Sequence, residues 1–167
     1  MEREVVTSCL AGDLQRAGNL LGIAIPAELL DKPTGLQFAQ MRLEEDPHYR
    51  LWSMRAIVLA DTGSMVGHIR FHSRPDPPEL QPFARGAVEF GYHIFRDQRR
   101  QGYATEAARA AMDWAQSCFG VHQFVVTISP DNQPSLAVAR RLGFVRIGEH
   151  IDEVDGVEHL FLRDIAA

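Results

Sequence analysis

Residues 96–105 read RDQRRQGYAT and join a β-rich run of sequence to a helical one. The run before them, residues 87–95, alternates apolar side chains, and from Gly102 onward alanines recur on one stripe of a predicted helix. Where a helix begins after a strand, unpaired backbone N–H groups converge at the positive end of its dipole. Gly102 lets the backbone approach a bulky anion closely, and Arg99 and Arg100 add positive charge beside it. The segment therefore predicts either a phosphate-binding loop or a solvated basic turn with Gly102 as its hinge.

The elements on either side of this loop alternate between helix and strand. In chain order, the patterns predict helices over residues 4–21 and 35–45, strands over 52–60, 65–72 and 87–95, a helix from residue 102, a strand over 123–129, a helix over 134–142, and a closing hairpin of strands over 144–151 and 157–163. No internal repeat interrupts this order. The sequence therefore predicts one α/β domain (of the α+β kind) with a mixed β-sheet.

Composition narrows the class of protein further. The chain has 167 residues, about the size of one domain, and its formal net charge of −5 argues against a general nucleic-acid surface. Its two cysteines, Cys9 and Cys118, lie too far apart in sequence to suggest a disulfide framework or a thiolate zinc site. No leader pattern and no apolar run of about 18 residues is present, so we expect a cytoplasmic protein without a membrane partner.

Four motifs together carry a resemblance to a known family. Arg99-x-x-Gly102-x-Ala104 is similar to the Arg/Gln-x-x-Gly-x-Gly/Ala acyl-CoA motif of the GNAT N-acetyltransferase superfamily. Three more elements lie at the spacing of its ribosomal-protein N-acetyltransferase-like branch: EFGY at 89–92, NQPS at 132–135 and LGF at 142–144. The resemblance covers a core of residues 50–163, whereas the helical residues 1–46 match only in kind.

This resemblance implies a single GNAT-like domain over residues 1–167, with helices flanking a sheet that is splayed open between the strands at 87–95 and 123–129. Acetyl-CoA would be the co-substrate, with its pantetheine in that cleft. The main chain near Ile94 and Phe95 would bond the pantetheine arm and polarise the thioester carbonyl. The residues that the resemblance implies for cofactor binding are Ile94, Phe95, Arg96, Arg99, Arg100, Gln101, Gly102, Tyr103, Ala104, Thr105 and Asn132.

The chain departs from the family in two places. The family usually has a strand before its first helix, and here a helix is predicted almost from Met1, so either the start is truncated or the sheet has one strand fewer. Many members also place a tyrosine four residues before the glycine of Gly-Phe, to protonate the leaving thiolate, and this chain has Ala139 there. A Cys-like thiol has a pKa near ~8.5 and leaves without full protonation, so an enzyme is still expected.

Glu89 and Ser135 are the candidate catalytic residues. An attacking ammonium must lose a proton, which a strand carboxylate at Glu89 would accept through water. The alternative for Glu89 is a solvent-facing carboxylate paired with an arginine. Ser135 either donates to the departing thiolate or bonds the backbone in the first turn of its helix, and Asn132 either caps that helix or bonds the pantetheine amides.

The function implied is an acetyl-CoA-dependent N-acetyltransferase that transfers the acetyl group directly to a primary amine, either a protein N-terminus or a small molecule. The alternatives are a non-catalytic CoA-binding or sensing module and an assembly protein that uses its N-terminal helices as an interface. We expect a monomer or homodimer. No metal site is expected, because His68 and His72 would lie ~13 Å apart on one strand.

Two surface segments have both a functional and a plain interpretation. The proline-rich residues 73–82 are either a surface loop or a lid over the substrate. The acidic side chains of the closing hairpin are either a solvated tip or, where the hairpin overhangs the cleft, a feature that favours a cationic amine. These side chains are Asp152, Glu153, Asp155 and Glu158.

Overall fold

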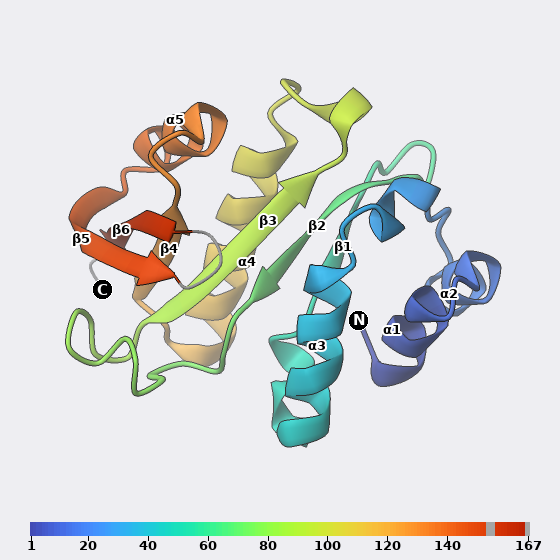
Figure 1. Ribbon diagram of the computed structural model, residues 1–167, viewed down its shortest axis with the longest axis horizontal. Helices are drawn as coiled ribbons and strands as arrows, with labels where there is room; N and C mark the ends of the chain where they lie inside the picture. Colours follow the sequence, from blue (N-terminus) through green and yellow to red (C-terminus); the bar gives the residue numbers. More distant parts are fainter. Residues whose placement is uncertain (153–155, 166–167) are drawn as a thin grey trace. The chain divides into compact units, whose positions relative to one another are not determined.

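The computed structural model describes residues 1–152 and 156–165, whose strands form one open sheet (Figure 1). Its six strands follow the order β1-β2-β3-β4-β6-β5. Strands β3 and β4 are parallel, whereas the pairs β1–β2, β4–β6 and β5–β6 are antiparallel. The predicted α/β class with a mixed sheet flanked by helices is therefore confirmed. By tertiary contacts the chain forms two compact units, residues 1–71 with 92–103 and residues 72–91 with 104–167.

The predicted order of helices and strands is present from residue 34 onward. The α-helices are α1 (Arg3–Leu10), α2 (Leu14–Leu21), α3 (Thr34–Glu45), α4 (Tyr103–Phe119) and α5 (Gln133–Arg141). The strands are β1 (Arg55–Val58), β2 (Met65–Phe71), β3 (Val88–Ile94), β4 (Gln123–Ile128), β5 (Val145–Asp152) and β6 (Gly156–Asp164). Short 3-10 turns lie at η1 (Ala27–Leu30), η2 (Pro47–Leu51) and η3 (Arg96–Gln98).

The single helix predicted over residues 4–21 is wrong, because two helices occupy this stretch. Gly12, at a φ of +79°, lies between α1 and α2 in the left-handed region that favours glycine. Asp13 then caps α2, since its side chain accepts a hydrogen bond from the backbone N–H of Arg16 at 3.0 Å. The apolar spacing continues across this break, which is why periodicity alone predicts one helix.

The first residues of β3 belong to the second unit and pair with β4. The parallel ladder consists of two pairs, Val88 with Phe124 and Glu89 with Val125. Helix α4 connects β3 to β4, as parallel strands require, and its buried stripe is Ala108, Ala111, Met112 and Ala115.

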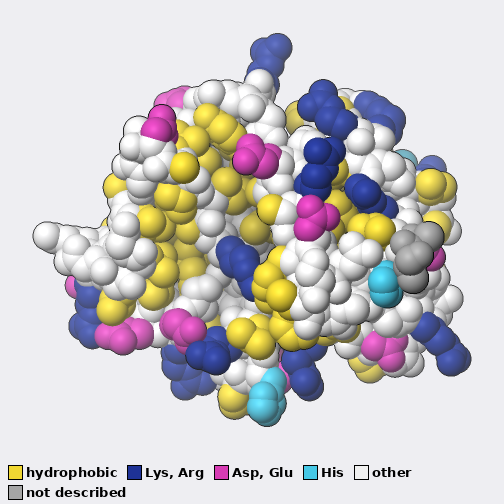
Figure 2. All heavy atoms as spheres, turned by 180° about the vertical axis from the view of Figure 1, so that it is seen from behind, with side chains coloured by type: hydrophobic (Ala, Val, Ile, Leu, Met, Phe, Trp, Pro, Cys, Tyr) yellow, Lys and Arg dark blue, Asp and Glu magenta, His cyan; other side chains and the backbone are white. Residues whose placement is uncertain are grey.

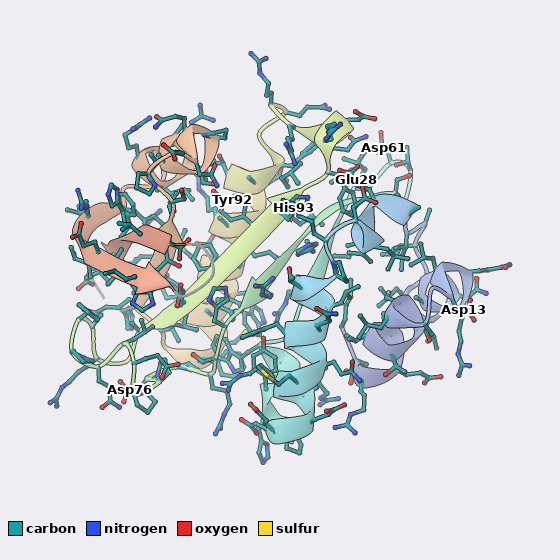
Figure 3. All side chains as sticks on the ribbon, viewed as in Figure 1. Asp13, Glu28, Asp61, Asp76, Tyr92 and His93 are labelled. Atoms are coloured by element: carbon teal, nitrogen blue, oxygen red, sulfur yellow. The ribbon has the colours of Figure 1, made fainter. Side chains whose placement is uncertain are left out.

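The proline-rich loop before β3 is anchored in the core of the second unit. Leu80 and Ala84 are buried in one cluster with Val125 and Leu160 of the sheet. Asp76 fixes the loop from within, because its carboxylate accepts a hydrogen bond from the N–H of Gly86 at 2.7 Å (Figure 3). These contacts favour a fixed surface loop over a substrate lid for this segment.

Candidate active site

The loop between β3 and α4 has positive φ angles at two residues, one of which is not glycine. It runs through η3 and reaches α4 with a φ of +65° at Arg100 and of +89° at Gly102. A Cβ built at Gly102 would meet no atom within 4 Å, so the surface at this position is open. The φ of +89° favours glycine at this position, because side chains rarely adopt it. Arg100 is a non-glycine residue held in the left-handed region two positions earlier.

Side chains in this loop bond other groups of the loop and the last residue of β3. The Nε of Arg99 donates to the carbonyl of Ile94 at 3.0 Å, and the hydroxyl of Tyr103 donates to Oε1 of Gln101 at 3.2 Å. Arg99 and Ile94, both implied as cofactor ligands, therefore contact each other directly. The Arg99 guanidinium therefore covers the carbonyl of Ile94 in this structure.

The main chain of Phe95 is already engaged. Its N–H donates to the carbonyl of Val66 at 2.9 Å, and its carbonyl accepts from the N–H of Gln98 at 2.9 Å. Its side chain is buried. Of the two residues implied as main-chain ligands, Ile94 is the one whose carbonyl accepts a hydrogen bond from a side chain, that of Arg99.

An acidic side chain lies at the entrance of the loop. Oε1 of Glu28 accepts a hydrogen bond from the backbone N–H of Arg96 at 2.7 Å, and Figure 3 shows Glu28 and His93 near the end of β3. Burial lowers the pKa of His93, and the positive charge of Arg99 lowers it further, whereas Glu28 raises it. The N–H of Arg96 is therefore occupied by a carboxylate, which sequence reasoning missed.

The Glu89 carboxylate is held by two side chains of the second unit. Its Oε1 accepts a hydrogen bond from the hydroxyl of Thr127 at 2.6 Å, and Nδ1 of His72 lies 3.4 Å from the same oxygen. The Glu89 side chain is 16% exposed. Burial raises the pKa of Glu89, but the contacts with His72 and Thr127 and the charge of His150 outweigh it and lower the pKa below its usual value.

The predicted alternative for Glu89, pairing with an arginine, is thus replaced by pairing with a histidine and a threonine. Thr127 reaches Glu89 through the parallel pairing of β3 with β4, which places Val125 beside Glu89 and residue 127 farther along the same face. The sequence alone does not give this register. His72 had no signal in the sequence either, since it follows β2 and reaches Glu89 by a contact between strands distant in sequence.

Helix α5 carries the remaining candidates. Oδ1 of Asn132 accepts a hydrogen bond from the N–H of Ser135 at 3.2 Å, so the capping interpretation of Asn132 is confirmed. Ser135 lies in the first turn and is half-buried. Ala139, where many relatives have a tyrosine, is 3% exposed on the same helix. The roles of Ser135 and Asn132 toward a ligand stay predictions.

Figure 2 shows several Lys or Arg side chains close together on one face of the molecule. The helices of the second unit carry exposed arginines, Arg109 on α4 with Arg140 and Arg141 in the last turn of α5. The negative net charge of the chain therefore coexists with exposed positive charge on these helices. Exposed positive charge attracts phosphate-bearing ligands over distances of a Debye length, about 10 Å.

The acidic hairpin is described only in part. Glu153 and Asp155 lie outside the described residues, as does the side chain of Asp152. Glu158 is half-buried on β6, opposite His150 of β5. Over residues 1–152 and 156–165, no group of three metal-ligating side chains is found and no helix is long and apolar enough to cross a membrane.

Comparison with known proteins identifies the family. The model of the acetyltransferase (GNAT) domain matches residues 27–145, most of the chain. The chain therefore belongs to the GNAT acetyltransferase family.

Among curated relatives, the uncharacterized N-acetyltransferase YnaD of Bacillus subtilis (strain 168) is 28% identical over 92 residues, which are 55% of this chain and 49% of that protein. The chain thus spans about half the length of the curated relatives it matches.

Two solved structures share the fold. One is the ribosomal-protein-S5-alanine acetyltransferase from Vibrio fischeri, with a TM-score of 0.61 and 20% identity over 80% of this chain and 72% of that chain. The other is RimL, the ribosomal L7/L12 α-N-protein acetyltransferase in complex with coenzyme A, with a TM-score of 0.60 and 22% identity over 80% of this chain and 71% of that chain.

Proposed function

We propose that this protein transfers the acetyl group of acetyl-CoA directly to a primary amine, on a protein N-terminus or a small molecule. The observation that carries the proposal is the loop before α4. There an open surface at Gly102 and two arginines lie at the start of a helix of 17 residues. Backbone N–H groups at such a helix start bind phosphate oxygens, and guanidinium groups strengthen that binding.

The loop residues would hold the pyrophosphate of the co-substrate. Arg99 and Arg100 supply the charge, and the backbone from Gln101 to Thr105 supplies N–H donors at the beginning of α4. The carbonyl of Ile94, released by Arg99, accepts a donor of the pantetheine arm. These residues bind and orient the thioester, and orientation of this kind accounts for a large part of the rate of a bimolecular transfer.

The proton balance of the transfer requires one acceptor and one donor. The acceptor amine loses a proton as its nitrogen bonds the acetyl carbon, and the Glu89 carboxylate takes that proton through water. The carbon–sulfur bond of the thioester then breaks, and the departing thiolate gains a proton from the Ser135 hydroxyl, which solvent restores. Since Ala139 stands at the place of the usual phenol, no tyrosine at that position supplies this proton.

A second candidate function is supported by that same alanine. A CoA-binding module without turnover would need the loop but neither Glu89 nor a proton donor. The two functions are separated by thiol release from acetyl-CoA, measured with a panel of peptide N-termini, polyamines and aminoglycosides. Acetyl transfer predicts thiol release above the blank with one acceptor class and its loss in Glu89→Gln, whereas saturable CoA binding with no release from any acceptor would establish the module.

A further inference from the structure

Glu89 and His72 are joined through both main chain and side chain. The backbone N–H of His72 donates to the carbonyl of Glu89 at 2.8 Å, and Nδ1 of its ring lies 3.4 Å from Oε1 of the same residue. Gly91 leaves room for the imidazole, because a Cβ there would come within 3.1 Å of Nε2. The backbone of β3, which carries Glu89 and Gly91, therefore confines the His72 ring beside the carboxylate.

Both donors reach the same oxygen of Glu89. The hydroxyl of Thr127 on β4 donates to Oε1 at 2.6 Å. His72, which follows β2, places Nδ1 3.4 Å from the same oxygen. Among the residues that the structure describes, Thr127 and His72 are the side chains that contact the Glu89 carboxylate. Oε1 is thus used for support, which leaves Oε2 for a ligand or a water molecule.

Resting on the proposed acetyl transfer, we propose that His72 and Thr127 are positioning residues that hold Glu89 by Oε1, so that Oε2 takes the proton of the acceptor amine. A carboxylate fixed at one oxygen loses rotational freedom and presents the other oxygen in a single direction. Geometry of this kind improves a general base before its proton affinity is considered.

The contact with His72 also acts on the proton affinity of Glu89. Together with the hydrogen bond from Thr127 and the charge of His150 on β5, it lowers the pKa of Glu89 against the opposing effect of burial.

The test compares kcat and KM at pH 8.5 in wild type, His72→Asn and His72→Ala. The asparagine amide keeps a donor near the position of Nδ1. We expect the kcat of His72→Asn to stay within about threefold of wild type, whereas His72→Ala removes the donor and should lose about tenfold in kcat. The KM for acetyl-CoA should be unchanged in both variants, because neither substitution lies in the loop before α4.

His150→Asn is the matched control, because it removes an exposed imidazole that is not among the groups bonded to Oε1. Its kcat at pH 8.5 should stay within about threefold of wild type. The proposal is overturned if His72→Ala keeps the kcat of wild type, if His72→Asn loses as much as His72→Ala, or if His150→Asn reproduces the loss of His72→Ala.

A second measurement needs no acetyl transfer. Carboxyl carbon NMR of Glu89 in the whole protein should show its pKa rise in His72→Ala, because burial is then opposed by Thr127 and His150 alone. An unchanged Glu89 pKa overturns the positioning role even when transfer is observed. A raised pKa with no transfer to any amine would instead overturn the proposed function, and with it the catalytic meaning of the contact.

Discussion

Replacing Arg100 separates the backbone strain of the loop from its charge. Arg100 has a φ of +65°, where an L side chain other than Asn or Asp costs about 1–2 kcal/mol. Arg100→Gly removes this cost but adds about 0.5–1 kcal/mol of unfolded-state entropy. Arg100→Ala keeps the strained angle. We therefore expect the glycine variant to exceed the alanine variant in free energy of unfolding by about 1 kcal/mol.

Binding of CoA should respond equally in the two variants. Both variants lose the guanidinium of Arg100. Because a charge-assisted hydrogen bond to phosphate contributes about 1.5–3 kcal/mol, the Kd for CoA should rise at least about tenfold in each variant. Stability is measured by urea denaturation and affinity by calorimetry. Equal stabilities of the two variants would refute the strain argument, and a wild-type Kd in both would refute a role of Arg100 in binding.

Two further predictions follow from the second unit. Thr127→Val removes the 2.6 Å hydrogen bond to the carboxylate of Glu89 and should destabilise the protein by about 1.5–3 kcal/mol at pH 7. The folded-state pKa of Glu89 is lowered, so the stability that its carboxylate contributes is present above pH 4.5 and disappears as the pH falls through the folded-state pKa. The loss of stability in Thr127→Val, measured by denaturation, should therefore be smaller in acid than at pH 7, and an equal loss at pH 7 and in acid would contradict the prediction. Ser135→Ala should lower kcat about tenfold, and less with acyl donors whose thiol has a lower pKa; a loss that is the same for every donor would remove Ser135 from the proton path.

The fold could be predicted from the sequence wherever local signals agree with tertiary packing. Helix α4 is an example, because its alanine stripe and the glycine beyond it mark both its buried face and its end. The break at Gly12 could not be predicted from spacing, since the apolar period continues through it. Turn chemistry at Gly12 and Asp13 overrides periodicity there.

The site shows the same division between local and distant contacts. The loop before α4 is contiguous in sequence, so its glycine and arginines are visible without a structure. The support of Glu89 depends on residues 17 positions before it and 38 positions after it, and only strand pairing brings them together. The engagement of Phe95 with Val66 is of the same kind.

The role of the loop is tested most directly by calorimetry of CoA binding to wild type and Gly102→Val. The variant must leave a φ of +89° and places a branched side chain where the surface is open, so CoA binding should be abolished. Gly120→Val is the matched control, since Gly120 has a φ of +66° and similarly open surroundings just past the far end of α4. The account predicts that wild type and Gly120→Val bind CoA and that pantetheine, which lacks the pyrophosphate, binds far more weakly. Unchanged CoA affinity in Gly102→Val would contradict it.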